Sequence, residues 1–289
     1  MTRVLVTGAA GMVGREALLA LKARGWEGIG FPHAALDVAD RLAVHDAIAS
    51  VAPDLVFNAA AYTQVDAAED NPELAWRVNA EGPAWLAEAC AARKVPLLHI
   101  STDYVFDGEN NRPWRPEDEP RPLGVYGETK WKGEQAVRAR MPHHLIVRTS
   151  WIYAPHGRNF FLTILRLARE RAQLEVVDDQ WGSPTLAADL AAAMCDAAAM
   201  VLEHSSGWGT YHFCNGGETT WYEFASVIVS DLIPPEQRTC RRVVPIQSAD
   251  WPTRAKRPRY SVLDTSSWTQ TFGLAPRPWR EALHDVCAK

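Results

Sequence analysis

Residues 3–14 read RVLVTGAAGMVG, an apolar run that passes directly into a glycine-rich turn. The run predicts a buried strand, and the apolar periodicity of residues 13–24 predicts a helix directly after the turn. Gly8, Gly11 and Gly14 allow a tight turn, a close approach of the backbone to a pyrophosphate, and free N–H groups at a helix N-terminus. We therefore expect a dinucleotide-binding turn, with a purely structural glycine turn as the alternative. A P-loop is excluded because no Gly-Lys-Ser/Thr follows.

The rest of the N-terminal half alternates apolar runs with helical patterns. Further strands are expected at residues 26–31, 53–58, 96–101 and 144–148, and further helices at residues 41–50, 73–94 and 187–199. Strands that alternate with helices imply right-handed βαβ units and a parallel sheet with helices on both faces. The fold class is therefore α/β, a doubly wound parallel sheet of the Rossmann type. Residues 107–123 are rich in Pro, Glu, Asn and Arg and are expected to form a loop.

The organisation of the chain changes at about residue 150, where tryptophans, prolines and short helices replace the regular alternation. We expect a dinucleotide-binding domain at residues 1–150, with segments of about 174–216 returning to it. The remaining residues, 151–173 and 217–289, are expected to form a second, smaller C-terminal lobe that binds the substrate.

Composition and charge exclude several classes of protein. The 289 residues are 47% hydrophobic and 22% charged, as in an ordinary globular protein, and the net charge of −5 argues against binding nucleic acid. No apolar run reaches the length of a membrane span, and the N-terminus starts with a strand pattern instead of a signal region, which favours the cytoplasm. Widely spaced cysteines without a CxxC pair indicate reduced thiols and no zinc site. These cysteines are Cys90, Cys195, Cys214, Cys240 and Cys287.

The choice of nicotinamide cofactor depends on the end of the second expected strand. A carboxylate at this place would hold the ribose 2′-hydroxyl of NADH, but the strand ends at Phe31 and the nearest acid is Asp37. Without that carboxylate the main electrostatic barrier to a 2′-phosphate is missing, and Arg15 or His33 could approach one. We therefore expect NADPH or NADH, with NADPH slightly favoured.

A tyrosine and a lysine four residues apart, Tyr126 and Lys130, form the candidate reacting centre. If this segment is helical, both side chains lie on one face. The ammonium would stabilise the phenolate, so that Tyr126 can protonate a carbonyl oxygen while a hydride reaches the carbon. Lys130 can also hold the nicotinamide ribose. Thr102, at the end of the fourth strand, can donate a hydrogen bond to the same oxygen. The alternatives are a turn-capping threonine and a packed surface tyrosine.

Several motifs together resemble the extended short-chain dehydrogenases/reductases and, within them, the dTDP-4-dehydrorhamnose reductase family. The motifs are TGxxGxxG at residues 7–14, NAAAYT at 58–63, STDYVF at 101–106, YGxxK at 126–130, RTSWIY at 148–153 and DQxGxPT at 179–185. The resemblance covers essentially the whole chain. It implies reduction of the C4 keto group of a nucleotide-activated deoxyhexose, so the expected partner is a nucleotide sugar.

The resemblance also implies roles for single residues. Tyr126 would donate the proton, and Thr102 would bind the substrate oxygen. Lys130 would activate Tyr126 and hold the nicotinamide ribose. Asp103 and Trp151 would contact the nucleotide sugar, with a lobe-packing tryptophan as the alternative for Trp151. The residues around the pyrophosphate would be Gly8, Gly11, Met12, Val13 and Gly14, those near the adenine Asp37 and Val38, and those near the nicotinamide Ala61, Tyr62 and Thr63.

Two further features bear on the substrate and on a metal. Four cations lie at residues 254–259, and we expect Arg257 to bind the substrate diphosphate, with a solvated loop as the alternative. Some family members are magnesium-dependent dimers joined through glutamates, and Glu16 matches one such position. Residues 186–188 carry no matching glutamate, so no metal site is expected and Mg²⁺ is unsupported. A homodimer stays open.

Two other functions are compatible with these motifs. A dehydratase of the same superfamily is disfavoured because Tyr104, and not a glutamate, follows Asp103. An epimerase is harder to exclude. A non-catalytic NADP-binding regulatory subunit would keep the fold, and the intact Tyr126, Lys130 and Thr102 argue against it without excluding it. The sugar configuration and the nucleotide base stay open as well.

Overall fold

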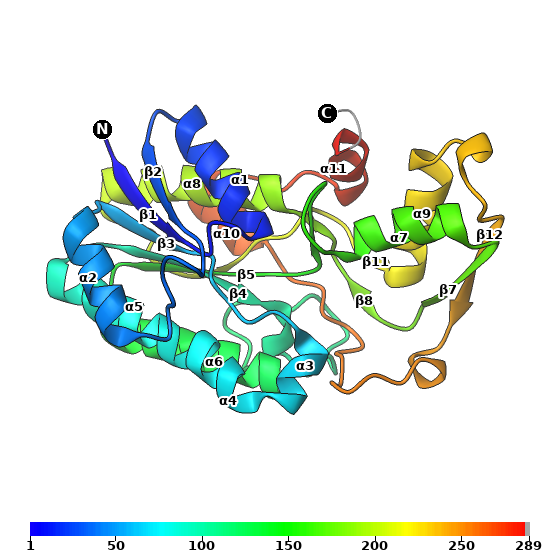
Figure 1. The fold of residues 1–289 in the computed structure, drawn as a ribbon, viewed down its shortest axis with the longest axis horizontal. Coiled ribbons are helices and arrows are strands. Elements are labelled where there is room, and N and C mark those ends of the chain that lie inside the picture. The colour runs from blue at the N-terminus through cyan, green and yellow to red at the C-terminus, as the bar shows by residue number, and fades with distance from the viewer. Residues whose placement is uncertain (287–289) are drawn as a thin grey trace.

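A six-stranded parallel sheet forms the centre of the larger part of the molecule (Figure 1). The computed structural model describes residues 1–286. Each neighbouring pair of strands runs parallel, as the alternation of strands and helices predicts. In spatial order the strands are β10 (Gly209–His212), β5 (His144–Thr149), β4 (Leu97–Thr102), β3 (Leu55–Asn58), β1 (Arg3–Thr7) and β2 (Glu27–Phe31).

Helices cover both faces of this sheet and enclose two hydrophobic cores. Val4 and Val6 of β1 belong to one core and Leu5 belongs to the other, which explains why the strand is apolar throughout. The first face carries α1 (Met12–Ala23), α8 (Ala187–His204) and α10 (Ser266–Phe272), and the second carries α2 (Arg41–Val51), α5 (Gly82–Arg93) and α6 (Val125–Arg140). The doubly wound α/β fold is confirmed.

The single helix expected at residues 73–94 is broken in the structure. It consists of α4 (Pro72–Trp76), a π-helical turn at Arg77–Glu81, and α5. Pro83 has no N–H for the helical ladder, and the N–H of Gly82 donates to the carbonyl of Arg77, five residues back. A short helix, α3 (Val65–Asp70), precedes α4. The loop expected at residues 107–123 is present and follows a 3₁₀ turn at Asp103–Val105.

A smaller part of the molecule has its own core, which includes Tyr153, Phe161, Phe224 and Trp279. Its helices are α7 (Phe160–Glu170), α9 (Trp221–Leu232) and α11 (Trp279–Asp285), with 3₁₀ turns at Pro235–Gln237 and Ser248–Asp250. Three two-stranded ladders complete it: β7 (Gln173–Val177) with β12 (Arg242–Ile246), β8 (Trp181–Gly182) with β11 (Thr219–Thr220), and β6 (Ile152–Tyr153) with β9 (Thr185–Leu186).

Two segments lie on the other side of the expected domain boundary. β7 falls almost wholly within residues 174–216, the segment expected to return to the dinucleotide-binding domain. It pairs instead with β12 in the smaller part. In α10, Trp268 and Phe272 pack into a core of the large sheet, although the segment lies within residues 217–289. Neither element was predicted from the sequence, because both are short and lie where the regular alternation of strands and helices has ended. The division into two domains stays a prediction.

Two expectations from composition concern thiols and membranes. The four described cysteines, Cys90, Cys195, Cys214 and Cys240, are buried and unpaired, and Cys287 lies outside the described residues. Burial raises the pKa of Cys90 and of Cys195 to about 12, so neither is a reactive thiolate. Within residues 1–286, no helix combines the length and the apolar character needed to cross a bilayer.

Candidate active site

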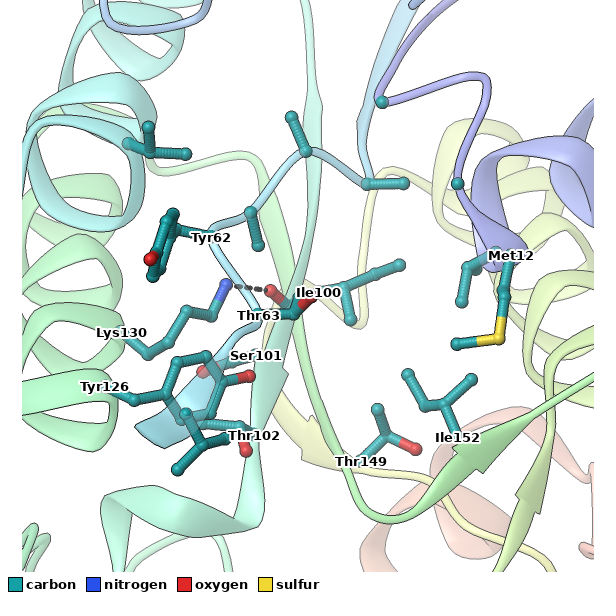
Figure 2. Close-up of a pocket in the computed structure, with 18 of the residues that line it drawn as sticks. Met12, Tyr62, Thr63, Ile100, Ser101, Thr102, Tyr126, Lys130, Thr149 and Ile152 are labelled. Atoms are coloured by element: carbon teal, nitrogen blue, oxygen red, sulfur yellow. Dashed lines mark hydrogen bonds between the residues drawn. The ribbon is translucent and has the colours of Figure 1, made fainter. Parts of the chain in front are cut away.

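A cavity of about 670 Å³ opens where β1, β3, β4 and β5 end, the edge at which parallel α/β sheets bind ligands (Figure 2). It brings together fourteen of the predicted site residues; Gly14 and Arg257 do not line it. The fourteen are Gly8, Gly11, Met12, Val13, Asp37, Val38, Ala61, Tyr62, Thr63, Thr102, Asp103, Tyr126, Lys130 and Trp151. Its volume lies in the range of small-molecule and cofactor sites.

The glycine turn has the geometry that a pyrophosphate needs. Gly8 has a φ of +63°, and a Cβ there would lie 2.6 Å from the carbonyl oxygen of Ala59. A Cβ on Gly14 would lie 2.3 Å from the carbonyl oxygen of Gly8, so this glycine permits close packing of helix and strand and need not touch a ligand. Gly11 caps α1 without any side-chain hydrogen bond, which leaves the first N–H groups of the helix open to an anion.

Asn79 holds the wall of the cavity at Tyr62, and sequence reasoning missed it. Its Oδ1 accepts a hydrogen bond from the Tyr62 N–H at 2.8 Å, and its Nδ2 donates to the Tyr62 carbonyl at 3.0 Å. Asn79 is buried in the π-helical turn and also donates to Thr129 of α6. A π-helical turn often marks a functional site, but the sequence read as an unbroken helix there.

The first turns of α6 place the tyrosine and the lysine on the cavity wall. The carboxylate of Glu69 accepts the N–H of Val125 at 2.8 Å and so caps the helix one residue before Tyr126. Lys130 is buried, and its Nζ donates to the Ile100 carbonyl at 2.7 Å (Figure 2). Burial lowers the pKa of Lys130 to about 8, while the buried Glu134 raises it. The helical YxxxK arrangement is therefore present.

The phenol of Tyr126 does not have the lowered pKa expected from its lysine neighbour. Burial raises the pKa of Tyr126 to about 12, and its hydrogen-bond partner Thr102 lowers it only in part. The lysine ammonium is directed at the carbonyl of Ile100 instead of at the phenol (Figure 2). Tyr126 is therefore held in its protonated form, the form required of a proton donor. Tyr104 packs edge-on against its ring, with centroids 5.6 Å apart.

Thr102 and Asp103 form a hydrogen-bonded pair directly after β4. The Thr102 Oγ1 donates to Asp103 Oδ1 at 3.0 Å and accepts from the N–H of Tyr104 at 3.2 Å. Thr102 therefore caps the 3₁₀ turn, as one alternative proposed, and also lines the cavity beside Tyr126. Asp103 is 2% exposed, and burial raises its pKa to about 6, while hydrogen bonding to Ser261 and Thr102 lowers it.

Two tryptophans form the wall of the cavity that faces the smaller part of the molecule. Trp151, expected to contact the nucleotide sugar, lies parallel to Trp221, and both line the cavity. Trp221 begins α9 and was missed, because nothing in the local sequence distinguishes a cavity-lining tryptophan from a packing one.

Arg257 lies in a groove that adjoins the cavity, where it is bound to Asp66 of α3. Its Nη2 donates to Asp66 Oδ2 at 2.7 Å and its Nη1 to Asp66 Oδ1 at 3.1 Å. The groove has a volume of about 580 Å³, is bounded by α7, β7 and Trp251, and meets the cavity at Trp221. Residues 254–259 form a loop in which Arg257 is half-buried and Arg254 is exposed, so the diphosphate role of Arg257 stays a prediction.

Three residues were considered as ligands of a 2′-phosphate or of a metal: His33, Arg15 and Glu16. His33 lines the cavity at the end of β2, whereas Arg15 is exposed on α1 and does not line it. Glu16 accepts a hydrogen bond from His156 Nε2 at 2.7 Å. Within residues 1–286, no three His, Cys, Asp or Glu side chains group as metal ligands would.

Comparisons with known proteins match the whole chain. A family model described as RmlD substrate binding domain matches residues 1–289. A dTDP-4-dehydrorhamnose reductase of Streptomyces griseus is 44% identical over 97% of this chain and 91% of its own length. A dTDP-4-keto-6-deoxy-D-glucose reductase of Streptomyces niveus is 39% identical over 97% of this chain and 95% of its own length.

A crystal structure shows the same fold. It is a dTDP-4-dehydrorhamnose reductase from Bacillus anthracis in complex with NADP, which is 35% identical, superimposes with a TM-score of 0.90 and covers 99% of both chains. The glycine turn, the YxxxK helix and the cavity that joins them agree with these matches. The chain therefore belongs to the RmlD family, the dTDP-4-dehydrorhamnose reductases of the extended short-chain dehydrogenase/reductase type.

Proposed function

We propose that this chain reduces the C4 keto group of dTDP-4-dehydro-L-rhamnose to dTDP-L-rhamnose with NADPH. One observation carries the proposal: the protonated Tyr126, Thr102 and Lys130 lie in the same cavity as the anion-binding glycine turn. This is the arrangement that carbonyl reduction requires, because a proton donor must face the reactive end of the dinucleotide. The names of the relatives from Streptomyces griseus and Bacillus anthracis support the substrate and the cofactor.

The chain supplies the groups that bind the cofactor and deliver the proton. Residues of the glycine turn would hold the pyrophosphate, Asp37 and Val38 the adenine side, and Lys130 the nicotinamide ribose. When bound, NADPH supplies the hydride for C4. Tyr126 donates its proton to the C4 oxygen, and the hydroxyl of Thr102 orients that oxygen. The Lys130 ammonium stabilises the resulting phenolate once it turns from the Ile100 carbonyl.

The second lobe provides the seat of the nucleotide sugar. Trp151 and Trp221 present aromatic surface to the cavity that Tyr126 also lines, which suits the apolar CH groups of a deoxyhexose. The nucleotide would extend into the adjoining groove, where Arg257 faces the diphosphate. Asp103, next to Thr102 on the cavity wall, would also contact the sugar.

A second candidate substrate comes from one relative. The Streptomyces niveus protein is named for dTDP-4-keto-6-deoxy-D-glucose, which differs from the rhamnose precursor in ring configuration. Both substrates place a C4 keto group before Tyr126, so the tryptophan wall must distinguish them. An epimerase would use the same cavity but would not consume the cofactor.

The test is a panel of 4-keto nucleotide sugars, each incubated with NADPH and with NADH, followed by determination of product stereochemistry. Stoichiometric oxidation of NADPH with the rhamnose precursor, giving the L-rhamno product, supports the proposal. An interconverted sugar without net oxidation of the cofactor indicates an epimerase. Binding of NADPH without turnover of any sugar indicates a regulatory subunit and overturns the proposal.

Two further proposals concern the cellular location and the oligomeric state of the protein. We propose that it acts in the cytoplasm, in keeping with the reduced buried thiols. A homodimer is the proposed oligomeric state, and it would form without a metal because Glu16 is bound to His156. Sedimentation in the presence and absence of a chelator tests this: a dimer that dissociates only with the chelator contradicts it.

A further inference from the structure

Two carboxyl groups of residues 1–286 line the cavity, Asp37 and Asp103, and Asp103 is the one next to Thr102 and the proton donor. It is 2% exposed and lies directly after β4, next to Thr102. The titratable groups that it influences are Tyr104 on its own turn, Tyr126 on α6 and Cys214 after β10. Burial raises the pKa of each, so all three are neutral at pH 7. Within residues 1–286, no cation contacts the Asp103 carboxyl.

The hydrogen bonds of Thr102 determine which group it can serve. A hydroxyl has one proton to donate and two positions at which it accepts. Thr102 donates its proton to Asp103 Oδ1 and accepts one hydrogen bond from the N–H of Tyr104. Its hydroxyl also lies on the cavity wall with Tyr126, whose pKa it lowers (Figure 2). While Asp103 is ionised, Thr102 therefore has no proton to offer to Tyr126 or to a substrate oxygen.

Protonation of Asp103 reverses this arrangement. A carboxylic acid donates to Thr102, which still accepts from Tyr104, and the hydroxyl proton of Thr102 then turns toward Tyr126. Because burial without a counter-ion favours the neutral acid, Asp103 exchanges its proton near neutral pH. Asp103 is buried but lines the cavity, so a proton would reach its carboxyl from that side between turnovers.

We propose that Asp103 is the proton reservoir of the reaction and reprotonates Tyr126 through the hydroxyl of Thr102. This inference rests on the proposed function. Reduction of the ketone consumes one hydride and one proton, and the phenol of Tyr126 loses that proton to the C4 oxygen. The Thr102 hydroxyl gives its proton to the phenolate and receives one from the Asp103 carboxylic acid. Asp103 is left as a carboxylate and takes up a proton from water, so the chain returns to its starting state.

The test separates the first proton transfer from its renewal. In Asp103→Asn the side chain keeps its shape and its hydrogen bond to Thr102 but has no acidic proton. With NADPH bound beforehand, a single turnover uses the proton already on Tyr126, so its rate constant is expected to stay within about 5-fold of the wild type. The steady-state kcat is expected to fall about 100-fold, with a larger effect of D₂O, because reprotonation becomes rate-limiting.

The matched control is Asp107→Asn. Asp107 carries the same carboxyl four residues along the chain, accepts the N–H of Glu109 at 3.0 Å and does not line the cavity. Its kcat and its D₂O effect are expected to equal those of the wild type. In a Thr102→Val background, Asp103→Asn is expected to lower kcat no further, because Thr102 is the link.

Three results would overturn the proposal. They are an unchanged kcat in Asp103→Asn, an equal loss of single-turnover rate and kcat, and full additivity with Thr102→Val. If Asp103→Asn does not fold, the pH dependence of the wild type is measured instead. Its kcat is expected to fall as Asp103 loses its proton with rising pH, whereas its single-turnover rate is expected to stay constant. If the wild type reduces the sugar and Asp103→Asn has the same kcat, only the role of Asp103 as proton reservoir is refuted. A wild type that oxidises no NADPH with any sugar refutes the proposed function itself.

Discussion

The indole of Trp151 lies on the indole of Trp221, with ring centroids 3.6 Å apart and an angle of 10° between the planes. The backbone of Trp151 has a φ of 46°, which a bulky residue rarely adopts. The backbone at Gly182 also packs against the Trp151 ring, where an added Cβ would lie 2.4 Å from a ring atom, so only glycine fits there. Trp151 is therefore closely packed against both Trp221 and Gly182, which favours a preformed wall for a ligand over a flexible one.

We expect Trp221→Ala to raise KM for the nucleotide sugar about 10-fold, because an aromatic contact contributes about 1 kcal/mol beyond its buried area. Binding of NADPH should change less, since Trp221 is not among the residues proposed to hold the cofactor. Initial rates and a cofactor titration measure the two effects. The control is Trp85→Phe, at a partly buried tryptophan of α5 that packs against Arg41 and does not line the cavity. An equal loss of affinity for NADPH would show that the variant damages the whole cavity.

Removing the phenolic hydroxyl in Tyr126→Phe should lower kcat by about two to four powers of ten, because the carbonyl oxygen then has no acid beside it. The Kd of NADPH should change little, since the pyrophosphate and adenine contacts lie elsewhere. Stopped-flow kinetics and cofactor fluorescence check both values. Near-normal turnover of this variant would remove Tyr126 from the reaction.

The preference for NADPH over NADH is expected to depend on His33 at the end of β2. His33→Asp places a carboxylate where it repels a 2′-phosphate and can accept a hydrogen bond from a ribose hydroxyl. The ratio of kcat/KM for NADPH to that for NADH should fall about 10-fold or more. Arg15→Ala, outside the cavity, should leave the ratio within about 2-fold. A larger change in Arg15→Ala than in His33→Asp would assign the 2′-phosphate to Arg15.

Arg257 is a proposed ligand of the substrate diphosphate, although it is bound to Asp66. We expect Arg257→Ala to raise KM for the nucleotide sugar about 10-fold, and Asp66→Asn to raise it less than about 3-fold, since the cation remains. Steady-state kinetics of the two variants decide between binding and packing. Equal effects would mean that the pair only joins the segment at residues 254–259 to α3. An unchanged KM in Arg257→Ala would end the proposal.

The sequence predicted the sheet and the cofactor side of the cavity because both depend on local patterns. Apolar runs and glycine spacing decide where β1 ends and α1 begins, and the chain supplies them within twelve residues. The π-helical turn with Asn79 and the stack of Trp221 on Trp151 depend on contacts between distant segments, which no local pattern reveals. The direction of the Tyr126 pKa shift was misjudged for the same reason. It depends on the burial of the phenol and on the Ile100 carbonyl, to which Lys130 donates.

The stability of the protein should depend on pH through Asp103. Its pKa in the folded protein is about 6, raised by burial from an ordinary value of 3.8. A raised carboxyl pKa makes ionisation unfavourable for the fold, so the destabilisation is absent below about pH 4, grows between pH 4 and pH 6, and is complete above that range. The difference amounts to about 3 kcal/mol.

Asp103→Asn, which cannot ionise, should therefore unfold at a higher temperature than the wild type at pH 8 and at nearly the same temperature at pH 4. Thermal unfolding measured across this pH range tests the expectation, with Asp107→Asn as the control that shows no such difference. A gain in stability at the expense of kcat would indicate that the buried acid is kept for the reaction. If the gain of Asp103→Asn over the wild type were no larger at pH 8 than at pH 4, folding would not raise the pKa of Asp103, and the carboxyl could not store a proton near neutral pH.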